Sequence, residues 1–150
     1  MKREFAIPMM TTLSMCVTAC TGSVEDTFIG EWTATSVLYN GETMAFPYVY
    51  TEEYDEGGTY TSSFGMSLSV KADATAILSL DYLYSYSDGT TESDSENYGA
   101  TWAQSEESKD GFLISFGDEE MISMRCTVVS DAEMNCTGGV FEESSFAKDN

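Results

Sequence analysis

The chain has 150 residues, of which 26 are acidic, 6 are basic and none is histidine, and its formal net charge is −20. This charge opposes binding to nucleic acid, whose phosphates need lysine and arginine, and opposes direct adhesion to anionic lipid. Without histidine the chain has no Ser-His or Cys-His nucleophile, no imidazole base and no His-containing zinc site. The length is typical of one domain, and we expect that domain to have neither enzymatic activity nor a cofactor.

The first residues have the features of an export signal. Lys2 and Arg3 precede a weakly apolar stretch that ends at Val17. This stretch is shorter than the ~20 apolar residues that a membrane-spanning helix needs. Its end, Val17-Thr18-Ala19-Cys20, resembles the lipobox of bacterial lipoproteins.

The resemblance implies how the protein is anchored and where it resides. Residues 1–19 are then a lipoprotein signal peptide, Cys20 is the site of lipid attachment, and residues 20–27 form a lipidated tether. The membrane is a partner only through this covalent lipid. Thr21 stands where an acidic residue often marks inner-membrane retention in related lipoproteins. We therefore expect a protein of the bacterial cell envelope, at the outer membrane.

Residues 28–150 form the predicted domain, and their dominant signal is alternation. In the segment 59–71 the even positions are mostly large and apolar, whereas the odd positions are Thr, Ser, Gly and Lys. Alternation of this kind is typical of a strand with one solvated face. Similar segments lie at 32–38, 44–50, 76–86, 98–102, 112–116 and 122–128, and a last strand follows a turn at 130–132.

The connections between these segments favour antiparallel neighbours. Asn40-Gly41 is a strong hairpin signal, and Ala72-Asp73 marks the bend between the two longest strands. No segment is long and helically periodic enough to supply the crossovers of a parallel sheet. We predict an all-β fold of about eight antiparallel strands closed into an up-and-down barrel, with a two-sheet β-sandwich as the alternative.

The segment Phe28-Ile29-Gly30-Glu31-Trp32 resembles the Gly-x-Trp opening of lipocalins and of small bacterial lipocalin-like lipoproteins. The similarity extends as a pattern through SVLYNGE, VKADATAIL, YGATW and the final hairpin. It implies that Gly30 and Trp32 close one end of the barrel and that a basic residue packs over the tryptophan. Arg125, the one arginine after Cys20, lies on the polar side of its strand. An ordinary strand start is the alternative interpretation of Gly-x-Trp.

The last two cysteines are predicted to form a disulfide. With Cys20 acylated and Cys16 lost with the signal, Cys126 and Cys136 remain as a pair in an oxidising compartment. A turn at Ser130-Asp131-Ala132 places them directly opposite one another in the hairpin, and the closer type of cross-strand pair suits a disulfide. Two free thiols are the alternative.

The even-numbered face carries many tyrosines, whose hydroxyls need hydrogen-bond partners when they are buried. If this face points inward, a wet pocket or a polar group of a ligand supplies those partners, and we expect a small amphipathic or hydrophobic ligand in the barrel. The alternative places the rings at a barrel mouth or on an outward face. The residues predicted to face the ligand are Tyr60, Tyr82, Tyr84, Tyr86, Tyr98 and Trp102.

Two acidic segments, 51–58 and 88–96, are expected as solvated loops, and calcium binding by the second is a further alternative. Three functions stay open from the sequence. The protein is a lipid-anchored binding module for a small ligand, a structural lipoprotein with a filled barrel, or an inhibitor or decoy whose acidic loops engage a cationic enzyme such as a lysozyme.

Overall fold

The computed structural model of the chain describes residues 22–54, 57–117 and 121–150. The predicted signal peptide, the lipobox and Cys20 lie outside the described residues, so lipid attachment stays a prediction. Among the helices of the described part, none has the length and apolar character needed to cross a bilayer.

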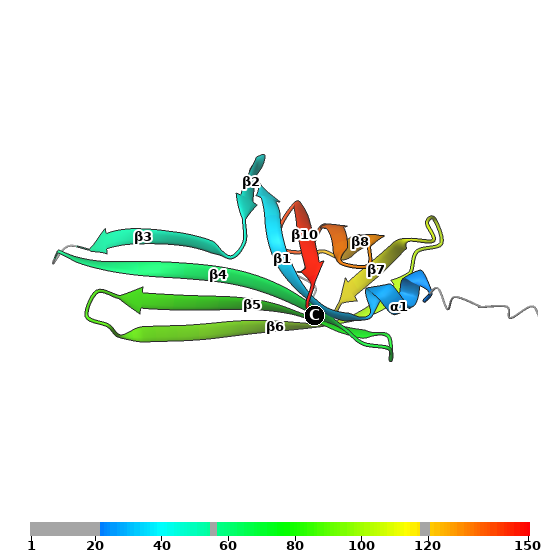
Figure 1. The fold of residues 1–150 in the computed structure, drawn as a ribbon, viewed down its shortest axis with the longest axis horizontal. Helices are drawn as coiled ribbons and strands as arrows, with labels where there is room; N and C mark the ends of the chain where they lie inside the picture. The colour runs from blue at the N-terminus through cyan, green and yellow to red at the C-terminus, as the bar shows by residue number, and fades with distance from the viewer. Residues whose placement is uncertain (1–21, 55–56, 118–120) are drawn as a thin grey trace, which may run out of the picture.

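The described chain consists of one short helix followed by ten strands (Figure 1). The helix lies in the C-terminal part of the predicted tether, and Ser23 caps it by accepting a hydrogen bond from the Asp26 N–H at 3.1 Å. The elements are α1 (Val24–Phe28), β1 (Gly30–Tyr39), β2 (Glu42–Ala45), β3 (Tyr48–Tyr54), β4 (Gly58–Val70), β5 (Thr75–Tyr86), β6 (Thr91–Gln104), β7 (Gly111–Phe116), β8 (Met124–Ser130), β9 (Glu133–Thr137) and β10 (Glu143–Lys148).

Eight of the strands close into an antiparallel barrel, as the alternation predicts. The sheet order is β2-β1-β10-β9-β8-β7-β6-β5-β4-β3, and a further pairing of β1 with β4 completes the ring. In that closing pairing Gly30 lies opposite Val70 and Trp32 lies opposite Leu68. Because the ring is continuous, the fold is a barrel and the β-sandwich alternative is wrong.

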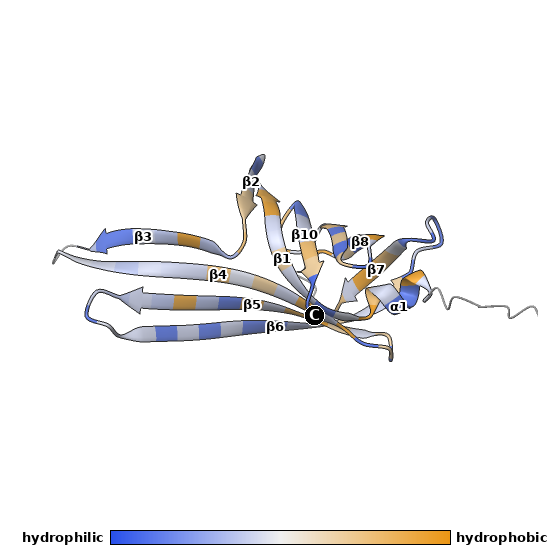
Figure 2. Cartoon of the chain, viewed as in Figure 1, coloured by the Kyte–Doolittle hydropathy of each residue, from blue (hydrophilic) through white to orange (hydrophobic). Residues whose placement is uncertain are grey.

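Three barrel strands continue beyond the ring and form, with β3, a four-stranded sheet that projects to one side (Figure 1). We call this sheet the extension and define it as residues 48–54, 58–65, 81–86 and 91–97. The segment 42–54 is divided at Pro47, so that β2 pairs with β1 on the barrel and β3 pairs with β4 on the extension. The extension is largely pale or blue in the hydropathy colouring of Figure 2, and it lacks the orange clusters of the barrel.

The barrel is filled by side chains along its length. Trp32, Leu78, Ile114 and Met134 are all fully buried, and each such side chain contributes about 1.5–3 kcal/mol relative to an exposed one. At the α1 end Phe28 stacks on Phe112, with 3.9 Å between the ring centroids. The interior is therefore a packed core at its centre and at the end covered by α1.

The opposite end of the barrel is covered by three phenylalanines. Phe46 lies edge-on to Phe64 and to Phe141, at centroid distances of 5.2 and 5.5 Å. Phe46 and Phe141 are buried, and Phe64 is the partly exposed member at the base of the extension. Aromatic side chains thus occupy both ends of the ring.

The predicted turns agree with the structure, but the two acidic segments do not. Asn40 and Gly41 have φ values of 51° and 77° between β1 and β2, as a type I′ hairpin turn requires. The segment 88–96, expected as a loop, is strand from Thr91 onward, and β3 covers 51–54 of the other acidic segment. The acids of 88–96 alternate with the period of a strand, and in both segments cross-strand pairing, with β5 and with β4, outweighed the polarity of the side chains.

Candidate functional site

Gly30 and Trp32, which were predicted to close one end of the barrel, lie at the end covered by α1. The Trp32 ring is fully buried, and its Nε1–H donates to the Phe28 carbonyl oxygen at 2.9 Å. The Lys148 ammonium lies 5.2 Å from the centre of the Trp32 ring and donates to the Thr27 carbonyl oxygen. This end is therefore held by the Trp32 hydrogen bond, by the cation–π contact of Lys148, and by the hydrogen bond from Lys148 to the Thr27 carbonyl oxygen.

The basic residue over the tryptophan is Lys148, which the sequence analysis missed. No local pattern identifies it, because Lys148 lies directly opposite Trp32 only through the pairing of the last strand with β1. Arg125 instead projects into solvent, where its guanidinium lies 3.8 Å from the Glu107 carboxylate and both side chains are mostly exposed. The polar side of β8 that the alternation assigned to Arg125 is therefore the outside of the barrel.

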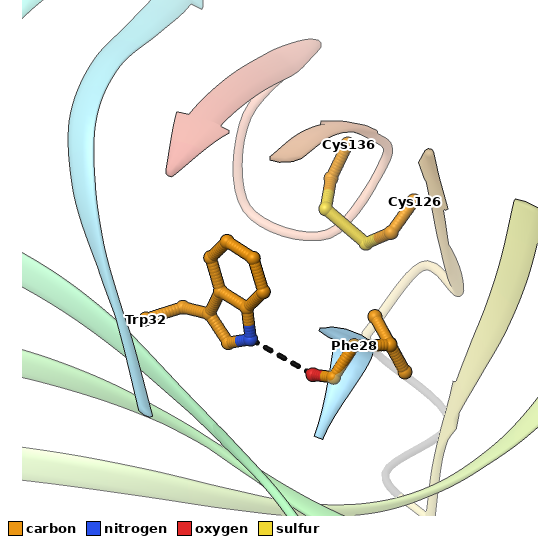
Figure 3. Close-up of a disulfide and its surroundings, with 4 residues drawn as sticks. All are labelled: Phe28, Trp32, Cys126 and Cys136. Atoms are coloured by element: carbon orange, nitrogen blue, oxygen red, sulfur yellow. Dashed lines mark hydrogen bonds between the residues drawn. A yellow bond between two sulfur atoms is a disulfide. The ribbon is translucent and has the colours of Figure 1, made fainter. Parts of the chain in front are cut away.

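The disulfide between Cys126 and Cys136 is present, as predicted (Figure 3). The two residues face each other across the β8–β9 hairpin, with 4.0 Å between their α-carbons. Both side chains are buried, and Figure 3 shows the bond on the same side of the barrel as Trp32 and Phe28. The bridge therefore joins the two strands of the hairpin to each other inside the core.

Four of the five predicted ligand-facing tyrosines are brought together on one side of the extension. Cross-strand register explains this, because Tyr50, Ser62, Tyr84 and Glu92 lie opposite one another on four successive strands and so point to the same side. We call this side the tyrosine face. Its aromatic members are Tyr48, Tyr50, Tyr54, Tyr60, Phe64, Tyr82, Tyr84 and Tyr86.

Five rings of the tyrosine face form a continuous track, namely those of Tyr48, Tyr50, Tyr60, Tyr84 and Tyr86. Tyr60 lies 6.4 Å from both Tyr50 and Tyr84 and 6.2 Å from Tyr86, measured between ring centroids. Tyr48 continues the track at 5.8 Å from Tyr50. These rings are half-buried by one another or exposed, since no second layer of the described chain covers them.

A second group of rings lies on the same face beside the barrel. Tyr82 stacks on Phe64 at 4.8 Å, and Phe64 belongs to the cluster that covers the barrel end. The alternation that lines the barrel therefore continues outward unbroken, with Tyr82 opposite Phe64 and Tyr84 opposite Ser62. Aromatic residues replace Leu, Met and Val where the ring of strands ends.

Carboxylates are interleaved with the tyrosines. Tyr60 donates its hydroxyl to Glu52, Tyr86 donates to Glu92 at 3.2 Å, and farther toward the barrel Tyr98 donates to Glu96 at 2.8 Å. The hydrogen bond to Glu52 raises the pKa of Tyr60 well above its usual range. The tyrosine face thus carries neutral hydroxyls beside ionised acids, and its potential is negative.

Burial and the nearby acids act on other tyrosines in the same direction. Partial burial raises the pKa of Tyr82, and the charge of Glu96 adds to the effect. Burial likewise raises the pKa of Tyr86, with a smaller contribution from its hydrogen bond to Glu92. A positive charge bound to this face would neutralise the acids that cause part of these shifts.

Two of the predicted ligand-facing residues, Tyr98 and Trp102, lie outside the tyrosine face. Tyr98 is half-buried on β6, nearer the ring than the extension. Trp102 belongs to the core, where its Nε1–H donates to the Lys71 carbonyl oxygen at 2.8 Å and its ring lies 5.3 Å from Phe28. The structure therefore assembles Tyr60, Tyr82, Tyr84 and Tyr86 into one surface and assigns Trp102 to packing.

The calcium alternative has no support in the described residues, which contain no cluster of three or more acidic or thiol groups placed to hold a metal. Asp88 accepts hydrogen bonds from the Thr90 N–H and hydroxyl, at 2.8 and 2.6 Å, and these bonds lower the pKa of Asp88. Asp88 is thus a turn residue, and Glu92, Asp94 and Glu96 point to the tyrosine face.

Two hollows lie elsewhere on the described surface. A depression of about 430 Å³ lies around Gly65 on the side of the extension opposite the tyrosine face, lined mainly by serines and aspartates. A second, of about 510 Å³, lies at the loop between β6 and β7 beside Leu113 and Arg125. Neither gathers groups of one chemical kind as the tyrosine face does.

Comparison of the chain with protein-family models, with curated proteins and with solved structures gave no match.

Proposed function

We propose that the protein is a non-enzymatic lipoprotein of the bacterial cell envelope, held at the outer membrane through Cys20, that binds a cationic protein on its tyrosine face. The single observation that carries the binding function is the track of tyrosines interleaved with carboxylates on an exposed side of the extension. The anchoring part rests on the lipobox-like sequence.

The chemistry of the tyrosine face favours a cation. Aromatic faces attract ammonium and guanidinium groups, each contact contributing about 0.5–1 kcal/mol at an exposed site. Glu52, Glu92 and Asp94 add ionised acceptors on the same side of the sheet. With a formal net charge of −20, the chain also attracts cationic proteins over distance, which raises the rate of association.

The openness of the face favours a macromolecule. Sites for small molecules are concave and enclose most of the ligand, whereas this face is one side of an uncovered sheet. The barrel fold is compatible with a small amphipathic ligand, but fully buried side chains such as Trp32 and Ile114 fill its interior. Among the functions that the sequence left open, capture or inhibition of a cationic protein therefore has the best geometric support.

A structural lipoprotein with a filled barrel is the second candidate. It is favoured by the packed interior and by the aromatic side chains at both ends of the ring. This role requires no ligand on the extension. The two candidates therefore differ in whether the tyrosine face has a binding partner.

Binding of lysozyme, used as a cationic probe, tests the proposal. We expect saturable binding that weakens as salt is added. Tyr84→Ser should weaken binding, whereas Leu83→Ser, which removes an exposed side chain from the opposite side of the same strand, should leave it unchanged. Glu92→Gln should also weaken binding, while Glu133→Gln on the distant strand β9 should act only through net charge.

Equal effects of Tyr84→Ser and Leu83→Ser would show that the tyrosine face is not the site. No salt-sensitive binding of lysozyme, or of a second basic protein such as cytochrome c, would leave the structural role as the better explanation. Circular dichroism of each variant checks that the extension keeps its strands.

A further inference from the structure

The extension has two free edges. The sheet order ends at β3, so no strand of the described chain lies beyond Tyr48–Tyr54. On the other side β7 pairs only with 100–104 of β6, which leaves the distal half of β6 as the second edge. A free edge presents backbone N–H and C=O groups to which another chain can add as a strand.

Hydrogen bonds between the strands show which residues of β3 are free. The Ser87 N–H donates to the Thr59 carbonyl oxygen at 2.9 Å, so Thr59 and the other odd residues of β4 point their backbone groups toward β5. The backbone groups of the even residues of β4 then point toward β3, where Tyr60 pairs with Glu52. The backbone groups of Val49, Thr51 and Glu53 consequently face outward.

The β6 edge is less open. The Tyr86 N–H donates to the Thr90 carbonyl oxygen, so the backbone groups of even residues of β6 point toward β5. By the same alternation, the backbone groups of Ser93 and Ser95 point outward. However, the Ser95 N–H already donates to the carboxylate of Asp94 at 2.9 Å. A strand added at the centre of this edge would have to break that bond.

We infer that the β3 edge binds an extended basic segment of the partner as an additional β-strand. This inference rests on the proposed function and specifies how the cationic partner is held. Three outward-facing residues, Val49, Thr51 and Glu53, offer the backbone groups for the pairing. The alternation of a strand then directs every second side chain of the added segment onto the tyrosine face.

The side chains around the edge define the segment. Residues opposite Tyr50 and Glu52 would lie on the tyrosine face, where a lysine or arginine meets an aromatic ring and a carboxylate. Residues opposite Thr51 would lie on the other side, near Val49 and Glu53, where threonine or another β-branched residue fits a strand. The preferred ligand is therefore a basic segment with a repeat of two.

A second copy of this chain fits the edge less well. Its net charge is also −20, and Glu52 and Glu53 of each copy would approach the other at a β3–β3 contact. A basic strand brings the opposite charge to the same two residues. Charge complementarity thus decides between these two occupants.

The test measures binding of a labelled, capped decapeptide of alternating lysine and threonine to the full chain in detergent. Thr51→Pro removes one outward N–H and places a ring where the added strand must approach, so binding should fall by about tenfold or more. Ser93→Pro is the matched control, because it makes the same change on the β6 edge, and it should bind like the unmodified protein.

Methylated peptides test the same geometry without changing the protein. The added segment is taken to run antiparallel to β3, as all paired strands of the described sheet do. Lysines on the tyrosine face then have backbone groups that point away from β3, whereas the backbone groups of the threonines between them point toward it. Methylation of the threonine amides should therefore abolish binding, and methylation of the lysine amides should preserve it. This comparison decides the inference even if Thr51→Pro does not fold.

The outcomes separate this inference from the proposed function. Loss of peptide and lysozyme binding in Tyr84→Ser but not in Thr51→Pro would mean that the partner lies flat on the face, so strand addition is wrong and the proposed function stands. Loss in Ser93→Pro alone would assign the other edge and overturn the inference. A dimer in sedimentation equilibrium that Thr51→Pro abolishes would show that a second copy takes the edge. Absence of any binding would overturn both.

Discussion

Replacing Gly30 with alanine should destabilise the barrel through two separate effects. The residue has a φ of +145°, which L side chains rarely adopt, and such backbone strain costs about 1–3 kcal/mol. An added Cβ would also lie 2.7 Å from Lys148 Cε, too close for any real contact. Lys148 would have to leave its place over Trp32, losing the cation–π contact and the bond to the Thr27 carbonyl.

The displaced lysine should add about 2 kcal/mol, the combined scale of a partly buried cation–π contact and a charged hydrogen bond that share one ammonium. We therefore expect Gly30→Ala to cost about 4 kcal/mol and Lys148→Ala about 2 kcal/mol. In the double variant the crowding is gone, so the alanine should cost only its strain of about 2 kcal/mol.

Guanidinium unfolding followed by tryptophan fluorescence measures these values, since Trp32 and Trp102 are both buried in the folded state. The reasoning depends on the coupling between the two positions. If Gly30→Ala costs the same with and without Lys148, then Lys148 does not crowd Gly30, and the account of this barrel end is refuted.

Three further predictions concern other parts of the chain. The bridge between Cys126 and Cys136 closes a loop of sequence separation 10, so the double alanine variant should lose about 2.7 kcal/mol in the chain-entropy model, and an unchanged unfolding midpoint would contradict this. Cys20→Ala should move the protein from the membrane fraction to the soluble fraction, whereas retention in the pellet without lipid mass on the wild type would rule out acylation. Glu52→Gln should lower the pKa of Tyr60 toward its ordinary value of 10.0, visible as earlier tyrosinate absorbance in an alkaline titration. Because the pKa of Tyr60 is raised in the folded state, the stabilisation from this pair is complete below the unfolded-state pKa and is lost as the pH rises through the folded-state pKa. The free energies of unfolding of the wild type and the variant should therefore converge in strongly alkaline solution.

The disulfide hairpin shows how much a local pattern can specify. Placing the turn at 130–132 fixes Val128 opposite Met134 and Cys126 opposite Cys136, and both pairings are present. Register was predictable here because a short turn leaves one pairing that keeps the apolar side chains on one face. The pairing of Lys148 with Trp32 was not predictable, since it joins the first and last strands and no local turn relates them.

The extension shows what the alternation of apolar and polar residues can predict and what it cannot. Alternation identified β4 and β5 and the common side of Tyr60, Tyr82 and Tyr84, because it depends only on the pleat. It could not indicate where the ring closes, since the same pattern continues from Leu68 to Tyr60 across that boundary. Closure depends on which strand reaches β1, and β1 pairs with β4 only over 67–70.

The end of the barrel can, however, be recognised from the types of large residue at the even positions of β4 and β5. Inside the ring an even position meets other side chains on every side, which favours Leu, Met and Val with no polar atoms. Beyond it, the same face meets water, and tyrosine covers the sheet while its hydroxyl stays hydrated or bonded to a carboxylate. The change from Leu80 to Tyr82 on β5, and from Met66 to Phe64 and Tyr60 on β4, therefore coincides with the end of the barrel. A tyrosine track of this kind keeps its strand register because the strands continue from the barrel, and it stays exposed because nothing in the described chain covers it.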